Sequence, residues 1–223
     1  MSMRSALITI WQYTAGWVFF AVWIPLIMIV TAVTLGRRKA TLGNAMVRGF
    51  GKGALWIAGV RLALDPAARA ELGRRRARVL TFNHSSTLDL FVGAALQPEG
   101  GVTVVKREIL HVPLLGQAVR VLDMLPIDRS NRERTTATLG AAAARLRSER
   151  LSAVIAPEGT RSLDGELGAF KTGAFHLAID AGVPVVPIVM HGCTRLWPLG
   201  SAHCEPGTLR IEVLDEVSTE GMT

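Results

Sequence analysis

The sequence lacks the features on which several classes of functional site depend. Its 223 residues include only two cysteines, Cys193 and Cys204, which show no metal-binding spacing and suggest no disulfide scaffold. It has no internal repeat, no low-complexity linker and no Gly-x-Ser-x-Gly motif of the kind that carries a hydrolase nucleophile. We therefore expect no metal, and a reducing compartment fits the cysteine content.

Charge is missing altogether from Ser5 to Gly36. This run exceeds the ~20 apolar residues that cross a bilayer as a helix. It also exceeds the ~7–15-residue apolar core of a signal peptide, so cleavage is not expected. Pro25 removes a helical hydrogen bond in the middle of the run. Two arrangements remain: one kinked span from about Leu7, or two short helices that dip into one leaflet.

Aromatic and basic residues around this run favour attachment to a membrane. Four rings suit a membrane interface, where amphipathic aromatic side chains settle: Trp11, Tyr13, Trp17 and Trp23. Three cations follow the run, Arg37, Arg38 and Lys39, against the single Arg4 before it. By the positive-inside rule, the rest of the chain is predicted to face the cytoplasm.

Positive charge is concentrated in one block. From Arg37 to Arg78 there are eleven basic residues against only Asp65 and Glu71, a net +9 in a chain whose total is +7. Such a block attracts polyanions, either nucleic acid or an anionic phospholipid membrane. The run Arg74-Arg75-Arg76 lacks aromatic neighbours on which bases could stack, which disfavours nucleic acid.

Short apolar runs rich in Val and Ile alternate with helical patterns after residue 40. We expect strands at 60–64, 78–82, 102–105, 124–127, 152–156 and 184–190, and a last one in "TLRIEVL". Helices are expected at about 41–57, 87–96, 113–122, 132–149 and 172–181. This alternation predicts an α/β domain over 37–223, after a membrane-attached segment over 1–36. Sites in such sheets form in the loops beyond the strand ends.

The first polar motif at a strand end is "NHSSTLD". On one continuous helix His84 and Asp89 would point ~140° apart, so they can meet only if the helix starts at Ser85 or Ser86. Asp89 would then lie in the first turn and could orient His84 as a general base. The alternative is that Ser86 and Asp89 form only a capping box, and both roles are compatible.

Two further motifs carry charge. Lys106 and Arg107 follow an apolar strand, where paired cations suit an oxyanion, although a solvated surface pair is the alternative. "PEGTR" places Glu158 and Arg161 around a glycine that permits a tight turn. Arg161 suits a phosphate, and Glu158 could orient Arg161 or accept a substrate hydroxyl. The alternative for this motif is a simple ion pair.

The fourth motif, the apolar stretch from Val183 to Pro187, has no titratable group. It fits either a wall of an acyl channel or an ordinary edge strand.

Taken in order, these residues resemble the glycerolipid acyltransferase superfamily, and within it bacterial 1-acylglycerol-3-phosphate acyltransferases. The similarity covers about 60–192. It rests on His-x4-Asp at 84–89, on the block from Lys106 to Gly116 with Ile109 in place of the usual Leu, on Glu-Gly-Thr-Arg at 158–161, and on Val-Pro-x-x-Pro at 183–187.

The resemblance implies the chemistry. His84 would take the proton of the free sn-2 hydroxyl of a lysophosphatidic acid, which attacks an acyl thioester of CoA or acyl carrier protein. Asp89 would orient His84, and Lys106, Arg107 and Arg161 would hold the phosphate. Glu158 and the backbone of Gly159 and Thr160 would shape the acceptor site. No cofactor, metal or covalent acyl-enzyme is implied.

Three alternatives remain. Members of this superfamily also acylate glycerol-3-phosphate, other lysophospholipids and lyso-ornithine lipids. A thioesterase would use His84 with water and ignore the lysolipid. A binding protein built on the basic block would not need His84.

Overall fold

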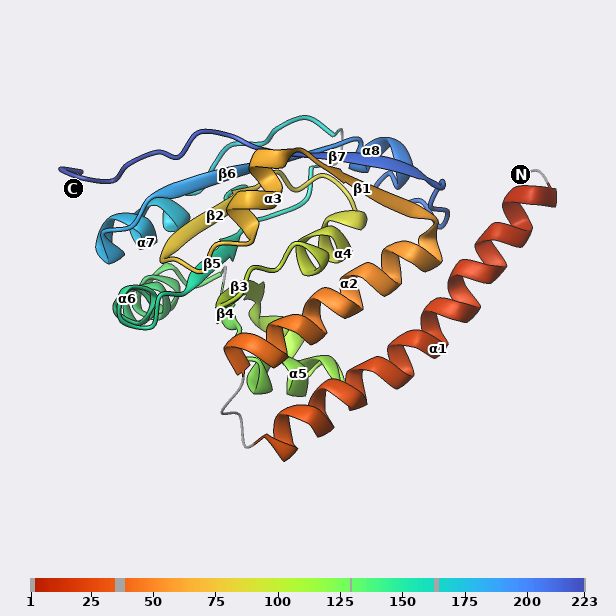
Figure 1. The fold of residues 1–223 in the computed structure, drawn as a ribbon, viewed down its shortest axis with the longest axis horizontal. Coiled ribbons are helices and arrows are strands. Elements are labelled where there is room, and N and C mark those ends of the chain that lie inside the picture. Colours follow the sequence, from red (N-terminus) through yellow and green to blue (C-terminus); the bar gives the residue numbers. More distant parts are fainter. Residues whose placement is uncertain (1–2, 35–38, 129, 163–164, 223) are drawn as a thin grey trace.

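The computed structural model describes residues 3–34, 39–128, 130–162 and 165–222 (Figure 1). Its helices are α1 (Met3–Val33), α2 (Asn44–Ala58), α3 (Pro66–Leu72), α4 (Leu88–Ala95), α5 (Leu115–Val121), α6 (Arg132–Ser148), α7 (Gly173–Ala181) and α8 (Cys193–Leu196), with a π turn η1 (Lys39–Gly43) and a 3-10 turn η2 (Arg107–His111). Its strands are β1 (Val60–Leu64), β2 (Arg78–Phe82), β3 (Gly101–Lys106), β4 (Leu125–Ile127), β5 (Ser152–Ile155), β6 (Val185–His191) and β7 (Gly207–Val213).

The seven strands form one mixed sheet in the order β1-β7-β6-β2-β5-β3-β4. The five strands from β6 to β4 are mutually parallel, whereas β7 runs antiparallel to β6 and carries β1 parallel to itself. The carboxyl ends of β6, β2, β5 and β3 therefore meet at one edge of the sheet. Sites in parallel sheets form at such an edge.

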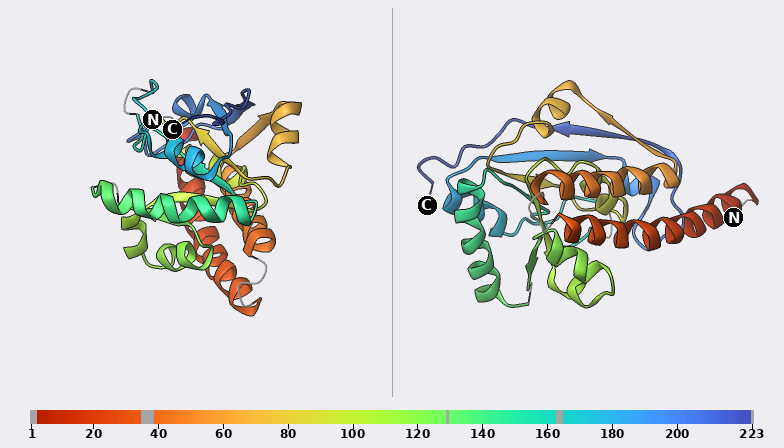
Figure 2. Two further views of the ribbon diagram at one scale, coloured as in Figure 1. Left: turned by 90° about the vertical axis from the view of Figure 1, so that its left-hand side faces the viewer. Right: turned by 60° about the horizontal axis from the view of Figure 1, so that its bottom comes forward.

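Each face of the sheet is covered by helices (Figure 2). Alternate residues of a strand point to opposite faces, so Leu80 of β2 packs with α2 and α4, while Val79 packs with α6 and α7. The predicted fold class, an α/β sheet flanked by helices, is confirmed. The predicted strands match within one or two residues at each end. The short elements α3, α8 and η2 were not predicted.

The stretch from Val183 to Pro187 is not an edge strand, because β6 lies between β7 and β2. That alternative is wrong. Val185 and Val186 point into the cores on the two faces of the sheet and are almost fully buried. Their apolar character is therefore explained by packing between two helical layers.

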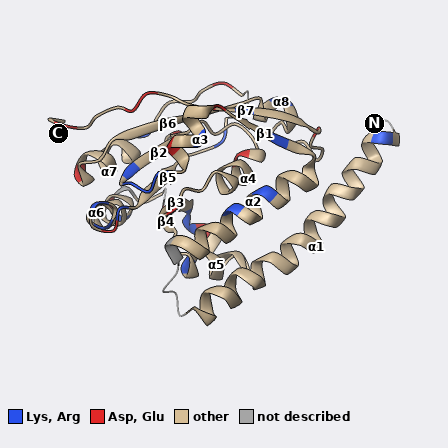
Figure 3. Cartoon of the chain, viewed as in Figure 1, with Lys and Arg blue, Asp and Glu red and all other residues tan. Residues whose placement is uncertain are grey.

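The N-terminal segment is one helix, α1, with Pro25 inside it, rather than two short helices. It is long and apolar enough to span a membrane. It runs antiparallel to α2, since Trp11 Nε1 donates to the carbonyl of Ile57 and Trp23 Nε1 to that of Met46. Figure 3 shows the described part of α1 almost free of charge, whereas basic and acidic residues lie over the sheet domain.

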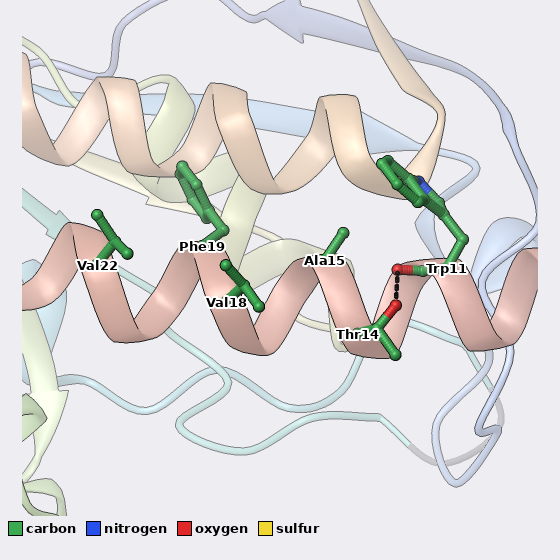
Figure 4. A pocket seen from close by; sticks show the side chains of 6 residues that line it. All are labelled: Trp11, Thr14, Ala15, Val18, Phe19 and Val22. Carbon is green, nitrogen blue, oxygen red and sulfur yellow. Dashed lines mark hydrogen bonds between the residues drawn. The ribbon is translucent and has the colours of Figure 1, made fainter.

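A shallow hollow runs along the face of α1 near α2 (Figure 4). It is lined by Trp11, Thr14, Ala15, Val18, Phe19 and Val22. Figure 4 shows Trp11 and Phe19 pointing toward α2. All of these residues belong to α1, and none of the predicted site residues lines the hollow.

The arginines from Arg74 to Arg78 form ion pairs with acidic residues of the same domain. Glu71 forms ion pairs with Arg76 at 2.5 Å and with the fully buried Arg78 at 2.5 Å. Burial acts to raise the pKa of Glu71, but the hydrogen bond from Arg76 and the charge of Arg78 outweigh it, and the pKa lies below its usual value. Arg76 and Arg78 of the predicted basic block therefore belong to a structural network rather than to a free surface. Arg37 and Arg38 lie outside the described residues.

Candidate active site

His84 and Asp89 meet in the loop that joins β2 to α4. His84 Nδ1 lies 3.0 Å from Asp89 Oδ2. The same oxygen accepts from the backbone amides of Ser85 at 2.6 Å and Ser86 at 2.8 Å. The helix begins at Leu88, slightly later than predicted, and Asp89 lies in its first turn. Asp89 thus both caps the loop and contacts the imidazole, as the sequence allowed.

The pair is partly shielded from water. The Asp89 side chain is fully buried, and the His84 side chain is 21% exposed, with the Phe82 ring packed edge-on against it. Oδ2 accepts from two amides, so it carries no proton and can only accept from the ring. Nδ1 is therefore the donor. This tautomer leaves Nε2 as a proton acceptor. Nε2 has no hydrogen-bond partner among the described residues.

The backbone of His84 is held from both sides by the loop after β5. Glu158 Oε1 accepts from the amide of His84 at 2.7 Å, and the amide of Ser162 donates to the carbonyl of His84 at 2.9 Å. Glu158 Oε2 accepts from the amide of Gly168 at 3.0 Å. Both oxygens of this buried carboxylate thus bind backbone amides. The structure gives Glu158 this contact rather than an ion pair with Arg161.

Gly159 adopts a left-handed conformation, with φ at 69°. A Cβ there would lie about 3 Å from the side chain of Lys171. The tight turn and close approach predicted for this glycine are therefore present. Lys171 was not predicted as a site residue, and it brings a further cation to the loop.

Arg161 extends toward the start of α4. Its Nη1 donates to Thr87 Oγ1 at 3.1 Å, so the guanidinium lies beside the helix that carries Asp89. Thr160 is exposed next to it. The loop after β5 thus presents a cation close to the His84 loop.

Lys106 and Arg107 reach the same edge of the sheet, because β3 pairs in parallel with β5. Lys106 Nζ lies 3.4 Å from Glu108, and both side chains are largely exposed. Arg107 Nη1 donates to Asp128 at 3.2 Å, beyond β4. The structure therefore brings Arg161 closer to the His84 loop than it does Arg107. Contact with substrate stays a prediction for all of these residues.

Two further connections join the His84 loop to the end of β6. Asn83 Oδ1 accepts from the amide of Met190, and Asn83 Nδ2 donates to its carbonyl. Ser86 Oγ donates to the carbonyl of Trp197 at 2.6 Å. Sequence reasoning did not identify these contacts, because they depend on β6 lying beside β2. Within the described ranges no three His, Cys, Asp or Glu residues form a metal-binding group.

Comparisons with known proteins agree with this geometry. The acyltransferase family model matches residues 68–191, which include every candidate site residue. A 1-acyl-sn-glycerol-3-phosphate acyltransferase of Limnanthes douglasii is 31% identical over 207 residues, covering 88% of this chain and 72% of its own. The alpha form from Mus musculus is 35% identical over 146 residues, covering 65% and 51%.

The fold has a solved counterpart. The crystal structure of the 1-acyl-sn-glycerophosphate acyltransferase PlsC from Thermotoga maritima superposes with a TM-score of 0.81 at 23% identity, covering 99% of this chain and 88% of that one. The predicted family resemblance is confirmed. This chain therefore belongs to the acyltransferase family, and it is an enzyme of the O-acyltransferase class.

Proposed function

We propose that this enzyme transfers a fatty acyl group from a thioester to the sn-2 hydroxyl of 1-acyl-sn-glycerol-3-phosphate, which gives phosphatidic acid. The relatives from Limnanthes douglasii and Mus musculus carry the name of this activity. The observation that carries the proposal is the contact of 3.0 Å between His84 Nδ1 and the buried Asp89, which leaves Nε2 for a substrate proton.

His84 acts as the general base. Its Nε2 accepts the hydroxyl proton while the hydroxyl oxygen attacks the thioester carbonyl carbon, so a C–O bond forms. The C–S bond then breaks, and the proton passes from His84 to the departing sulfur. Asp89 orients the ring and stabilises the positive charge that it carries between these two steps. The thioester is already activated, and neither a metal nor an acyl-enzyme takes part.

Cations at the edge of the sheet bind the phosphate of the acceptor. Arg161 is the best supported, because it contacts Thr87 only three residues beyond His84. A guanidinium binds a phosphate through paired, charge-assisted hydrogen bonds. Lys106 and Lys171 add point charges, and Arg107 joins them if it exchanges Asp128 for the phosphate. Gly159 and Thr160 shape the turn, and Glu158 holds it against His84.

The acyl donor is a thioester of CoA or of acyl carrier protein. A different lysolipid, such as a lysophospholipid or a lyso-ornithine lipid, is the alternative acceptor, and a thioesterase is the alternative activity. The test offers the purified enzyme one labelled acyl-CoA or acyl carrier protein with a panel of lysolipids, and identifies the product by mass. The proposal predicts labelled phosphatidic acid. Free fatty acid regardless of acceptor would contradict it.

We also propose that α1 attaches the enzyme to an anionic phospholipid membrane while lying in one leaflet. Gln12 Nε2 donates to the carbonyls of Ala58 at 3.1 Å and Cys204 at 2.8 Å, which ties α1 to the domain. If α1 crossed the bilayer, α2, which packs beside it, would also enter the bilayer and would carry Arg48 and Lys52 into the hydrocarbon. Trp17 and Ile29 are 69% and 59% exposed, and exposed apolar residues on such a helix insert into lipid. The proposed location of the enzyme is the cytoplasmic side of a bacterial inner membrane.

A further inference from the structure

The two oxygens of the Asp89 carboxylate have unequal surroundings. Oδ2 interacts with two backbone amides and with the ring of His84. Oδ1 is buried and has no hydrogen-bond partner among the described residues. A buried polar atom without a partner is destabilising, and more so when it is charged. A donor to Oδ1 would therefore stabilise the carboxylate that positions His84.

Cys193 stands where such a donor is needed. It is the first residue of α8 and follows β6, the parallel neighbour of β2 that carries the His84 loop. Its side chain is buried, in the same core as Leu88 of α4. Thr194, the next residue, has Oγ1 3.4 Å from the carbonyl of Ser85. The start of α8 is thus tied to the loop that surrounds the Asp89 carboxylate.

The state of the thiol fits a donor. Burial first, and then the negative charge of the neighbouring Asp89 carboxylate, raises the pKa of Cys193. The sulfur therefore keeps its proton and is no nucleophile, since the thiolate is the reactive form. A protonated thiol is a weak hydrogen-bond donor.

We propose that Cys193 is a positioning residue for acyl transfer, whose S–H group donates to Asp89 Oδ1. This inference rests on the proposed role of Asp89 in orienting His84. With this hydrogen bond formed, both carboxylate oxygens have donors, and rotation of the carboxylate away from the imidazole breaks bonds at both. Without it, only Oδ2 is held.

The kinetic test compares Cys193→Ala, Cys193→Ser and the control Cys204→Ala. Cys204 is as buried as Cys193 and lies in the same core, but its sulfur contacts the carbonyl of Glu205. Loss of one hydrogen bond worth about 1 kcal/mol predicts about a fivefold lower kcat for Cys193→Ala, with KM for both substrates unchanged. The acidic limb of its pH profile should move to higher pH, because Asp89 becomes a stronger acceptor for the imidazolium.

Cys193→Ser should restore kcat and the wild-type pH profile, because a hydroxyl donates at the same place. Cys204→Ala should leave the pH profile unchanged. The inference is overturned if Cys193→Ala keeps the wild-type kcat and profile, or if Ser and Ala at position 193 behave alike. Either result would mean that the thiol only fills space.

A second measurement does not depend on turnover. The infrared S–H stretching band of a thiol shifts when it donates to a carboxylate. In the folded wild type we expect two bands, from Cys193 and Cys204, of which Asp89→Asn shifts only one. Identical spectra of wild type and Asp89→Asn would overturn the inference even if Cys193→Ala failed to fold. An enzyme without acyl transfer but with the Asp89-dependent band would refute the proposed function and leave the hydrogen bond standing.

Discussion

At the scale of single residues, the backbone of His84 is held as firmly as its ring. The ring contacts Asp89, and the amide and carbonyl of His84 bond to the loop after β5 through Glu158 and Ser162. A general base acts only within hydrogen-bonding reach of the proton that it removes. Fixing both the main chain and the ring of His84 therefore sets the position of Nε2.

Glu158→Gln tests this arrangement with almost no change in shape. The amide side chain has one oxygen acceptor, so it cannot accept from both His84 and Gly168. We expect a stability loss of about 1–3 kcal/mol for the amide left without a partner. We also expect kcat to fall by up to about 10²-fold as His84 moves. Denaturant unfolding and steady-state kinetics measure the two effects.

The control for this change is Glu149→Gln, which removes a charge from an exposed ion pair with Arg145 on α6. Exposed pairs contribute little, so its stability and kcat should stay near wild type. If Glu158→Gln matched this control, the carboxylate would not be what holds His84.

The sequence predicted only part of the site. The spacing from His84 to Asp89 at the start of a helix is a local pattern, so it could be interpreted as a pair, with the cap as the alternative. The contacts of Ser162 and Cys193 are not local, because they require that β5 and β6 flank β2. Their residue types carry no signal of their own, and the order of strands was not predicted.

At the scale of elements, the glycines of α2 are packing surfaces. Glycine inside a helix costs about 1 kcal/mol relative to alanine, so Gly49, Gly51 and Gly53 are expected to destabilise α2. A Cβ at Gly49 would lie 2.6 Å from Trp23 of α1, and one at Gly51 would overlap the backbone of Ala95 in α4. α2 therefore approaches α1 and α4 closely on different faces.

Gly51→Ala and Gly140→Ala should have opposite effects. The added methyl at Gly51 has no room against α4, and overpacking typically costs about 1–3 kcal/mol. Gly140, in α6, has nothing within 4 Å of the added Cβ, so alanine should stabilise by about 0.8–1 kcal/mol. Thermal unfolding of both variants measures the difference. A stabilised Gly51→Ala would mean that α2 and α4 do not pack this closely.

The longer elements were predictable because each has a local pattern, either a helical period or a continuous apolar run. The buried strands are continuous apolar runs, and Leu80 and Val79 serve opposite faces without any alternation in polarity. The helices α3 and α8 have 7 and 4 residues, too short to show a helical period. The direction of β7 was also not predictable from the sequence, because it depends on the pairing of β7 with β6.

At the scale of the whole molecule, the orientation of α1 relative to the bilayer distinguishes insertion into one leaflet from a full span. Met3 is 82% exposed at the start of α1, and both native cysteines are buried. A single cysteine introduced as Met3→Cys can therefore be labelled selectively. If α1 lies in one leaflet as proposed, a membrane-impermeant thiol reagent added to sealed vesicles should label this cysteine from the side that carries the catalytic domain. Labelling only from the opposite side would show that α1 spans the bilayer.

In the proposed mechanism, His84 removes the proton of a lysolipid hydroxyl during acyl transfer. The most direct measurement is release of free thiol from acyl-CoA by wild type and by His84→Ala, with and without lysophosphatidic acid. If His84 is the general base, thiol release requires the acceptor and falls by about 10²- to 10⁴-fold in the variant, the usual contribution of a general base. Thiol release that proceeds equally well without acceptor, or that survives in His84→Ala, would contradict it.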